Sequence, residues 1–598
     1  MGGIAGILQF DGQQPDPNQL LQLAHGVGHR GPDAKARWSE GPIGLAHRRL
    51  QTTSRTHQQP LVDDDLALVV DGRLYDGGVE ALARAWKDEG SACLPGLDGP
   101  FAFALWDRRR SVLWLARDAM GRRPLFFARG GPNGTAFSSE IPPLLGLPWV
   151  SRELAHDHLA EYLSFRYVHA PRTLLRDIHG LPPGHLLRVD RDGARAERWY
   201  RPRTVAPGAD LPDPGAAAEA IDAALGRAVE KRLQGDTPPA LLLSGGLDSS
   251  AILHHARRLG ASPPTFTVSM ADDPMDESSI ATRVASMLGA EHHIVRIRNE
   301  DFVASIATAT RHMGQPLPTA AGALQHLLFK EILPVSKVIL SGDGGDEVLA
   351  GRSMDRLAAR MRRSGVLGAL PGPARLVLRT GLRRAGMHDL GATKAHFGRE
   401  RLIGGSRVFH SGERVEVLRD PGLVRPGIRR TVLDPLYQEI VADPINAILY
   451  VWQRGWLPED GLARNDRMAS ALGMEVRLPM LDEGLRAAAS ALPGLAKVRA
   501  KGLGFETKAP LRASLRKVLP VQLVDRPKRS LPNPLDRWLR TAGRDWLSTR
   551  LEELMDDPDG IFVPSALARL EQEHRLGQRN HGLKLWTLAL FWEWKRQL

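Results

Sequence analysis

The segment from Ala240 to Ala251 constrains the fold more than any other stretch, because it joins a strand, a small-residue loop and a helix without a break. It reads Ala-Leu-Leu-Leu-Ser-Gly-Gly-Leu-Asp-Ser-Ser-Ala. The apolar start predicts a buried strand of a parallel sheet, and the residues that follow Ala251 continue at helical spacing. Such a unit directs backbone N–H groups and the positive end of a helix dipole at an anion. No Gly-Lys-Ser/Thr closes the loop, so it predicts a phosphate-binding loop other than the Walker type.

A second loop has the same design. The segment that starts at Lys337 reads Lys-Val-Ile-Leu-Ser-Gly-Asp-Gly-Gly-Asp-Glu-Val, so an apolar strand again runs into small residues, here with Asp343, Asp346 and Glu347. Carboxylates at neighbouring strand ends can hold Mg²⁺ against phosphate oxygens. We therefore predict Asp248 and Asp346 as metal ligands. Taken alone, the second loop could instead be an acidic surface turn.

The chain is organised in two differently patterned parts. Residues 1 to 150 alternate short apolar runs with Gly, Asp and Pro, which is typical of many short strands. From residue 240 onward strands and helices alternate, with further strands expected at 265–269 and 292–297. This pattern predicts an α/β protein whose second part is a doubly wound parallel sheet. The Pro-, Gly- and Asp-rich segment 201–215 is the expected linker.

Composition narrows the class of protein. At 598 residues, 42% of them hydrophobic and 25% charged, the chain is long enough for two or more globular domains. No apolar run is long enough to span a membrane, and a single cysteine, Cys93, excludes a disulfide framework. We therefore expect a cytoplasmic protein that does not bind membranes. The net charge of +12 is spread over scattered arginines without interleaved aromatic residues, which favours a solvated surface or acidic substrates over nucleic acid.

Motifs along the whole chain resemble one family. Both loops look like those of the ATP pyrophosphatase (PP-loop) enzymes, and the N-terminal motifs resemble the glutaminase domain of class II amidotransferases of the asparagine synthetase B type. The N-terminal motifs are Met1-Gly-Gly-Ile-Ala-Gly-Ile, His29-Arg-Gly-Pro-Asp33, His47-Arg-Arg-Leu50, Phe101-Ala-Phe-Ala-Leu-Trp-Asp107 and Ala116-Arg-Asp-Ala-Met-Gly-Arg-Arg-Pro-Leu125. Further motifs begin at Trp456, Gly473, Phe505 and Asp525.

The resemblance implies a domain plan. It predicts an α+β sandwich of the Ntn-hydrolase type at 1–200, the linker at 201–215, and an asparagine synthetase-like ATP pyrophosphatase domain at 216–598. Residues 352–445 are basic and lack family motifs, so we interpret them as a variable helical insertion.

The resemblance also implies a site for ATP and Mg²⁺. Lys528 fits the family's catalytic lysine, whose ammonium can neutralise charge on the tetrahedral intermediate and the departing phosphate. We predict Asp343 and Glu347 as further catalytic residues. The expected ATP- and pyrophosphate-binding residues are Leu243, Ser244, Gly245, Gly246, Asp248, Ser249, Ser250, Val268, Ser341, Gly342 and Gly344.

The expected glutamine pocket departs from the family. In the family an N-terminal cysteine attacks glutamine, and its own α-amine serves as the base. This chain has Gly2 at that position, and the family's Asn-Gly-Glu segment reads Asp71-Gly72-Arg73. An Asp carboxylate would repel an oxyanion to which an Asn amide would donate. With Arg49, these positions form a glutamine pocket that we predict to be inactive and kept for structure.

Function follows from an intact synthetase half and a damaged glutaminase half. We predict an ATP-dependent, AMP- and pyrophosphate-forming synthetase that adenylates an Asp or Glu side chain and couples it to an amine without hydrolysing glutamine. The favoured type is a lasso peptide cyclase (macrolactam synthetase), with a precursor peptide as substrate and a leader-binding protein and a leader peptidase as partners. An ammonia-dependent asparagine synthetase-like ligase for a small carboxylate and a β-lactam synthetase-like ligase are alternatives, although Asp343 replaces the tyrosine of ring-closing β-lactam relatives. A protein that binds ATP without catalysing a reaction, a pseudoenzyme, is a more remote alternative.

Overall fold

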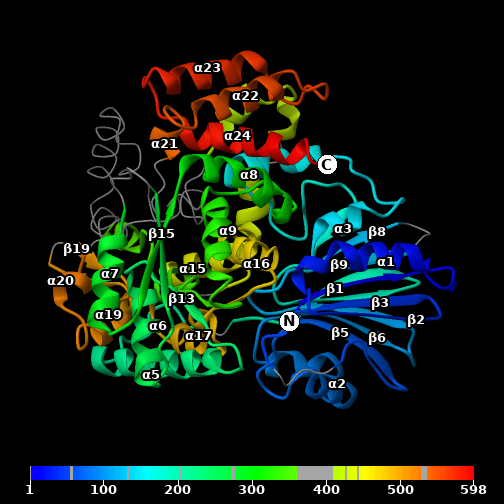
Figure 1. Ribbon diagram of the computed structural model, residues 1–598, viewed down its shortest axis with the longest axis horizontal. Coiled ribbons are helices and arrows are strands. Elements are labelled where there is room, and N and C mark those ends of the chain that lie inside the picture. The colour runs from blue at the N-terminus through cyan, green and yellow to red at the C-terminus, as the bar shows by residue number, and fades with distance from the viewer. Residues whose placement is uncertain are drawn as a thin grey trace, which may run out of the picture.

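The computed structural model describes most of the chain. The described residues are 2–53, 58–130, 134–202, 204–270, 276–359, 408–424, 427–440, 443–502, 504–526 and 535–598. They form two units that pack side by side, an antiparallel sandwich at the right of Figure 1 and a parallel sheet with helices at the left.

The N-terminal unit contains two six-stranded antiparallel sheets that pack face to face. The first has the order β10-β8-β9-β1-β3-β2, with β1 Gly2–Leu8, β2 Ala34–Glu40, β3 Ile43–Arg49, β8 Phe126–Arg129, β9 Thr135–Ser138 and β10 Ile178–Gly180. The second has the order β12-β11-β7-β6-β5-β4, with β4 Leu61–Val62, β5 Leu66–Gly72, β6 Phe101–Asp107, β7 Val112–Arg117, β11 His185–Asp190 and β12 Gly193–Arg198.

Alternation of side chains along these strands builds four layers. Ile4 and Leu45 of the first sheet pack against Val69 of the second, because every other residue of a strand faces the same side. The outer faces are covered by helices, as Figure 1 shows: α1 (Pro17–Gly26) and α3 (Ile141–Leu145) on the first sheet and α2 (Gly78–Glu89) on the second. The sandwich expected for the N-terminal domain is confirmed.

The C-terminal unit is built on a five-stranded parallel sheet. Its order is β15-β14-β13-β16-β17, with β13 Ala240–Leu242, β14 Thr265–Met270, β15 His292–Ile297, β16 Val338–Leu340 and β17 Glu475–Arg477. Leu241 packs into the cluster that contains α5 (Pro214–Leu233), α6 (Leu247–Arg258) and α7 (Ser278–Met287). Ala240 packs on the opposite face with α8 (Asn299–Met313), α9 (Ala321–Ile332) and α16 (Ala463–Ser470). The doubly wound sheet is therefore confirmed, and its strand order reverses between β13 and β16.

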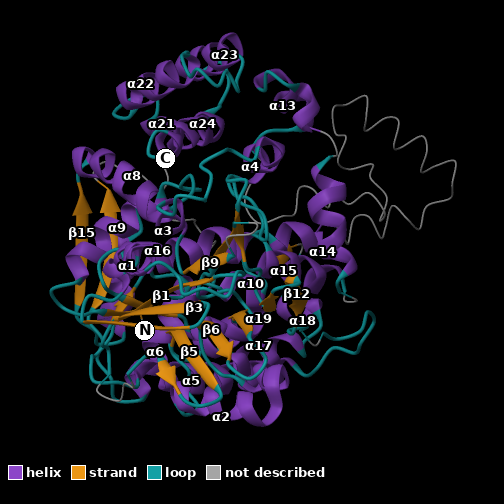
Figure 2. Ribbon diagram, turned by 90° about the vertical axis from the view of Figure 1, so that its right-hand side faces the viewer, coloured by secondary structure: helices purple, strands orange, loops and turns teal. Residues whose placement is uncertain are grey.

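Additional helices surround this sheet. Near its carboxyl edge and lower side lie α10 Gly345–Leu349, α15 Pro444–Arg454, the π-helix η9 Leu457–Leu462, α17 Glu483–Ser490, α18 Gly494–Lys497, the hairpin β18 Arg499–Lys501 and β19 Gly504–Glu506, α19 Ala509–Leu515 and α20 Val521–Val524. At the top of Figures 1 and 2 a helical end group contains α4 Leu159–Phe165, α13 Ser411–Val417, α21 Leu535–Trp538, α22 Arg544–Met555, α23 Pro564–Arg575 and α24 Gly582–Lys595. Short segments complete the order: η1 Gly28–Arg30, η2 Gly90–Gly96, η4 His156–His158, η7 Pro421–Val424, η8 Arg429–Leu433, α14 Asp434–Gln438 and η10 Pro479–Leu481.

Three sequence expectations touch this architecture. The described parts of the proposed 352–445 insertion are mainly helical, whereas residues 360–407, with the densest arginines, lie outside the described residues. The proposed linker 201–215 lies between the end of β12 and the second residue of α5. Among the described helices, none is long and apolar enough to cross a bilayer.

A buried ion-pair network joins the two units. Arg30, 1% exposed, contacts Asp71 at 2.8 Å and Glu140 at 2.9 Å within the sandwich, and Asp466 on α16 at 2.8 Å. Arg123 reaches the other oxygen of Asp466 at 2.7 Å. Removing one member of such a buried network leaves an unpaired charge, which costs about 3–5 kcal/mol. The network therefore fixes how the sandwich sits on α16.

The domain contact should be sensitive to acid. Burial raises the pKa of Asp466, but Arg30 and Arg123 outweigh burial and lower this pKa to about 2. A lowered carboxyl pKa stabilises the fold above the unfolded-state value near 3.9, and this contribution, about 2–3 kcal/mol, disappears as the pH falls through about 2. Urea unfolding followed by tryptophan fluorescence should show this loss between pH 4 and pH 2.

Asp466→Asn should be less stable than wild type at neutral pH and should lose less stability on acidification. Asp210→Asn, at an exposed linker position, is the control and should behave as wild type. An Asp466→Asn protein with the wild-type acid profile would show that this carboxyl does not control the acid response.

Candidate active site

The first phosphate loop connects β13 to α6 at the point where the strand order of the parallel sheet reverses. Gly245 adopts a φ of +66°, which favours glycine, and a Cβ there would lie 3.0 Å from the backbone nitrogen of Ala281. Gly246 donates its N–H to the Ser244 hydroxyl at 3.3 Å, and the hydroxyls of Ser244 and Ser249 lie 3.4 Å apart. The loop thus presents hydroxyls and a helix N-terminus at the position where doubly wound sheets bind ligands.

The second phosphate loop follows β16 and leads into α10. Ser341 is buried and donates its hydroxyl to Asp343 at 2.6 Å, and Asp343 also accepts from the Asn465 amide at 2.9 Å. Gly344 has a φ of +91°, and a Cβ there would lie 2.4 Å from the Leu481 side chain. The loop is therefore folded tightly against α16 and η10.

Glycines bring the two loops into direct contact. A Cβ on Gly342 would lie 2.9 Å from the Cβ of Asp248, and one on Gly345 would lie 2.4 Å from the Asp248 carboxylate. A Cβ on Gly351 would lie 1.9 Å from the Asp346 carboxylate. Side chains at these positions would push the carboxylates apart, so the glycines are what allow Asp248 and Asp346 to face one point.

Lys508 occupies that point. Its ammonium lies 2.6 Å from Asp248 Oδ1 and 2.7 Å from Asp346 Oδ1, and the side chain is 2% exposed. Burial lowers the pKa of Lys508, but the two carboxylates outweigh burial and raise the pKa above its ordinary value, so the lysine is charged. Lys508 adopts a φ of +52° just before α19, a conformation that costs about 1–3 kcal/mol in a non-glycine residue.

The same arrangement fits the predicted magnesium ion. Mg²⁺ is commonly held by one or two carboxylates together with substrate phosphates, and the Lys508 ammonium shows that both carboxylates converge on one cation. No group of three His, Cys, Asp or Glu side chains suited to a metal occurs among the described residues, so substrate phosphates would have to complete the coordination. Asp248 and Asp346 are the residues that would hold the ion.

Sequence reasoning missed Lys508. The lysine predicted from the sequence, Lys528, lies between the described residues 504–526 and 535–598, so its catalytic role stays a prediction. The segment that carries Lys508 was recognised as a motif, but no local signal distinguishes its lysine from a surface lysine. Only the path of β18, β19 and the turn before α19 brings this side chain, 260 residues along the chain, to Asp248.

The remaining predicted residues flank the two loops. Leu243 and Ser250 are buried, Val268 is half-buried on β14, and Glu347 is buried on α10 beside Asp346. Arg526 contacts Glu277 at 2.9 Å and donates to the Gly245 carbonyl at 3.2 Å. Arg526 therefore lies at the first phosphate loop.

The expected glutamine pocket has been filled by internal contacts. Gly2 has a φ of +156°, and a Cβ there would lie 1.6 Å from the Arg48 carbonyl oxygen. The Asp71 carboxylate is fully buried and accepts from the Gly2 N–H at 3.4 Å and from Arg30 at 2.8 Å. Arg49 lies opposite Gly2 in the β1–β3 register.

The flanking positions of that pocket are also engaged. Gly72 has a φ of +151°, and a Cβ there would lie 2.2 Å from the Pro100 carbonyl oxygen. Arg73 donates to the carbonyl of Gln234, just beyond α5, at 2.9 Å. The predicted pocket positions thus lie close together, but they bind one another and the second domain.

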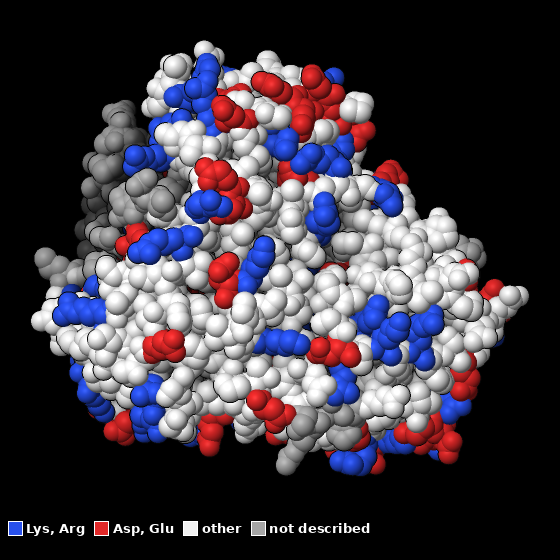
Figure 3. Space-filling view, viewed as in Figure 1, with Lys and Arg blue, Asp and Glu red and all other residues white. Residues whose placement is uncertain are grey.

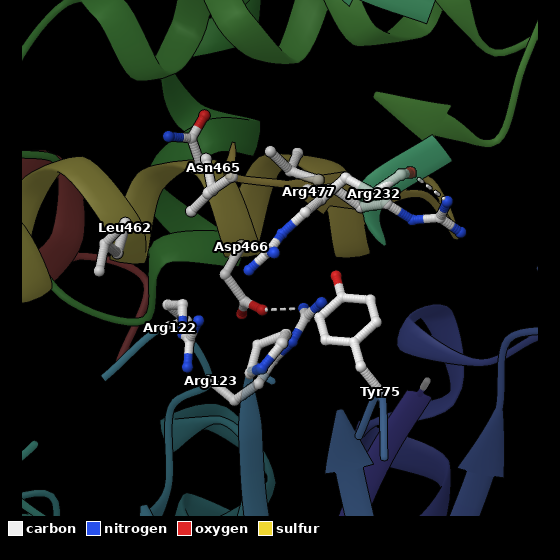
Figure 4. Close-up of a pocket in the computed structure, with 11 residues that line it drawn as sticks. Tyr75, Arg122, Arg123, Arg232, Leu462, Asn465, Asp466 and Arg477 are labelled. Atoms are coloured by element: carbon white, nitrogen blue, oxygen red, sulfur yellow. Dashed lines mark hydrogen bonds and ion pairs between the residues drawn. The ribbon is translucent and has the colours of Figure 1, made fainter. Parts of the chain in front are cut away.

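A small cavity lies between the two units (Figure 4). The volume that the centre of a water molecule can occupy in this cavity is about 20 Å³, which is enough for about one or two waters. Four arginines, Tyr75, Asn465 and Asp466 are among the residues that line it. The arginines already have partners, since Arg477 binds Glu475 at 2.8 Å and Arg122 binds Asp118 at 3.0 Å, so the cavity is a polar seam of the domain contact.

Comparison with known families identifies both halves of the chain. Residues 220–596 match the family described as asparagine synthase, and residues 1–200 match the one described as glutamine amidotransferase domain. The chain belongs to the asparagine synthase family. Homologues in this family are ATP-dependent carbon–nitrogen ligases, which confirms the predicted reaction class but does not extend to the lasso peptide subtype.

Two relatives of this asparagine synthase-family chain extend over nearly its whole length, and a third extends over about half of it. A Mycobacterium tuberculosis protein whose name places it with the asparagine synthetases is 30% identical over 96% of this chain and 93% of its own length. Asparagine synthetase (glutamine-hydrolyzing) 1 of Bacillus subtilis is 25% identical over 97% of this chain and 94% of its own. Amidase chyE of Penicillium rubens is 30% identical over 54% of this chain and 53% of its own.

Removing the Lys508 charge should expose the two carboxylates to metal. We expect Lys508→Met to lose activity by about 10²–10³-fold, because a cation at the reacting phosphates is absent. We also expect added Mg²⁺ without nucleotide to raise its melting temperature more than that of wild type, because Asp248 and Asp346 then face each other without a cation. Thermal unfolding with and without MgCl₂ measures this. Lys501→Met, at an ion pair whose lysine is 56% exposed, is the control. An Mg²⁺ response equal to that of wild type would rule out a shared cation position.

Restoring a nucleophile should not restore glutaminase activity. In Gly2→Cys the new Cβ meets the Arg48 carbonyl, so we expect a loss of stability of about 1–3 kcal/mol and no release of glutamate from glutamine. Urea unfolding and a glutamate assay measure the two effects. Gly96→Cys, at an exposed position where a Cβ meets nothing within 4 Å, is the matched control. Glutamate release by Gly2→Cys above the wild-type background would show that only the nucleophile had been lost.

Proposed function

We propose that this chain is an AMP- and pyrophosphate-forming amide synthetase that activates a substrate carboxylate and joins it to an amine that glutamine does not supply. The observation that carries the proposal is the convergence of Asp248, Asp346 and Lys508 where the strand order reverses. This arrangement places a lysine cation and two potential metal ligands beside a helix N-terminus, as the transfer of an adenylyl group requires.

In the first step a substrate carboxylate oxygen attacks the α-phosphorus of ATP, and the bond from that phosphorus to the bridging oxygen breaks to release pyrophosphate. The backbone N–H groups and hydroxyls from Ser244 to Ser250 bind phosphate oxygens, and Lys508 offsets the charge that grows on the leaving group. Mg²⁺ that binds with the phosphates would share the Asp248 and Asp346 carboxylates with the Lys508 ammonium and would also neutralise phosphate charge.

In the second step the amine nitrogen attacks the acyl carbon, the bond from carbon to the AMP oxygen breaks, and the amine loses a proton. Asp343 is placed to accept this proton. Its hydrogen bonds from Ser341 and Asn465 both end on Oδ2, and within the described residues Oδ1 accepts none. A half-exposed carboxylate with one unengaged oxygen is suited to act as a general base.

The nitrogen source is assigned from the state of the N-terminal domain. A glycine replaces the nucleophile, and Asp71 and Arg30 occupy the pocket as an ion pair. The Bacillus relative is named as glutamine-hydrolyzing, but a chain without a nucleophilic side chain at residue 2 cannot form the acyl-enzyme of that reaction. Free ammonia or an amine of the substrate is left as the nucleophile.

For the substrate we propose a peptide whose Asp or Glu side chain is joined to its own N-terminal amine, as in lasso peptide cyclases. A leader-binding protein and a leader peptidase would then act with it in the cytoplasm. Both full-length relatives are named as glutamine-hydrolyzing asparagine synthetases, which supports a second candidate substrate, a small carboxylate such as aspartate. For this chain the nitrogen donor would then be ammonium, because residue 2 is a glycine. Asp343 in place of tyrosine makes a β-lactam product the weaker choice. Basic and acidic side chains are interspersed on the face seen in Figure 3.

Pyrophosphate release tests the proposal. Wild-type protein with Mg·ATP is incubated with linear peptides that have a free N-terminus and an internal Asp or Glu, with aspartate plus ammonium, and with aspartate plus glutamine. We expect continued release in the first or second mixture, and Asp248→Asn should lower it by about 10²-fold or more. In the third mixture release should not exceed about one equivalent per enzyme, because no amine then removes the adenylate.

The control variant, Asp210→Asn in the exposed linker, should retain wild-type release. Glutamine that supports release as well as ammonium does would overturn the assignment of the nitrogen source. An absence of pyrophosphate release in all three mixtures would favour a protein that binds ATP without turning it over.

A further inference from the structure

Behind Asp343 lies a chain of buried side-chain hydrogen bonds. The Asn465 amide donates to Asp343 at 2.9 Å, and its oxygen accepts from the Gln325 amide at 3.1 Å. The Gln325 oxygen in turn accepts from Arg464 Nε at 2.7 Å, and Arg464 is paired with Asp460 at 2.7 Å. Because an arginine can only donate, it sets the orientation of Gln325, which then sets the orientation of Asn465. The Asn465 amide therefore has to present its N–H groups to Asp343.

The helix that carries Asn465 is fixed by the N-terminal domain. The next residue on α16, Asp466, accepts hydrogen bonds from both terminal nitrogens of Arg30, at 2.8 and 3.1 Å. It also accepts one from Arg123 at 2.7 Å. Arg30 also donates from Nε to the carbonyl of Gly2, at 3.2 Å, and pairs with Asp71. The position of the missing nucleophile is thus one end of a network that reaches α16.

We propose that the former glutaminase domain acts as a brace for the synthetase site: through Arg30 and Asp466 it holds α16 so that Asn465 positions Asp343. Asn465 is a positioning residue and touches no substrate. The inference rests on the proposed function for the role of Asp343 as a base, whereas the brace itself is a statement about structure and can be tested without turnover. It gives the domain a task that needs no cysteine.

The brace has a consequence for activity. Loss of the Asn465 donor should lower kcat by about tenfold, because Asp343 would be held by Ser341 alone, while the KM for ATP stays unchanged. General destabilisation of the fold would not separate kcat from KM in this way.

Hydrogen–deuterium exchange of the full chain tests the brace without a substrate. Asn465→Ala should speed exchange of the loop amides from Ser341 to Glu347 by about tenfold or more. Arg30→Lys keeps the charge but loses the forked guanidinium, and should speed exchange both in α16 and in that loop. Arg550→Met, which breaks a partly buried ion pair with Glu593 between α22 and α24, should leave the loop unchanged.

The outcomes separate the two proposals. Loop exchange that is unchanged in Asn465→Ala would refute the positioning role. Faster exchange in α16 alone for Arg30→Lys would refute the link from the N-terminal domain to the loop. If wild-type protein releases no pyrophosphate with any carboxylate, the proposed function fails, and the exchange data still decide whether the brace exists.

Discussion

The buried guanidinium of Arg30 is the interaction on which the rest of the structure depends. A fully buried cation is tolerated only with matched partners, and here they come from both domains: Asp71 and Glu140 from the sandwich and Asp466 from α16. Arg30 also donates hydrogen bonds to the Asp71 carboxylate, at the expected oxyanion position, and to the Gly2 carbonyl. The side chains that join the domains are therefore the same ones that lie at the expected glutamine pocket.

The synthetase site depends on a second constraint, the close approach of two loops at the reversal of strand order. β13 and β16 are hydrogen-bonded neighbours at the point where the strand order reverses, and glycines let the loops that follow them meet. Asp248 and Asp346 would repel each other at this distance without a cation. The Lys508 ammonium supplies that charge and is held in place by burial, so the site is organised before any ligand binds.

Much of this was predictable from the sequence, and the failures share a cause. Apolar runs followed by small residues identified both loops, and the parallel sheet then required Asp248 and Asp346 to lie near each other. The position of Lys508 between these carboxylates was not predictable, because its local pattern is similar to that of other lysines in basic segments, and the role of Lys528 stays a prediction. Asn465 was missed because an amide on a helix carries no sequence signal of its own; its role appears only when α9, α16 and the second loop meet.

The sequence by itself determined which reactive side chains are available. The segments Ser244 to Ser250 and Ser341 to Glu347 supply hydroxyls and carboxylates after two strands, and a glycine at residue 2 excludes a side-chain nucleophile there. Only the tertiary structure decided which cation lies between Asp248 and Asp346 and how the N-terminal domain meets α16. The physical reason is the separation of the contacting residues along the chain. Hydrophobic periodicity reports which face of a single helix or strand is buried. Arg30 and Asp466 are 436 residues apart, and their contact exists only after both domains have folded.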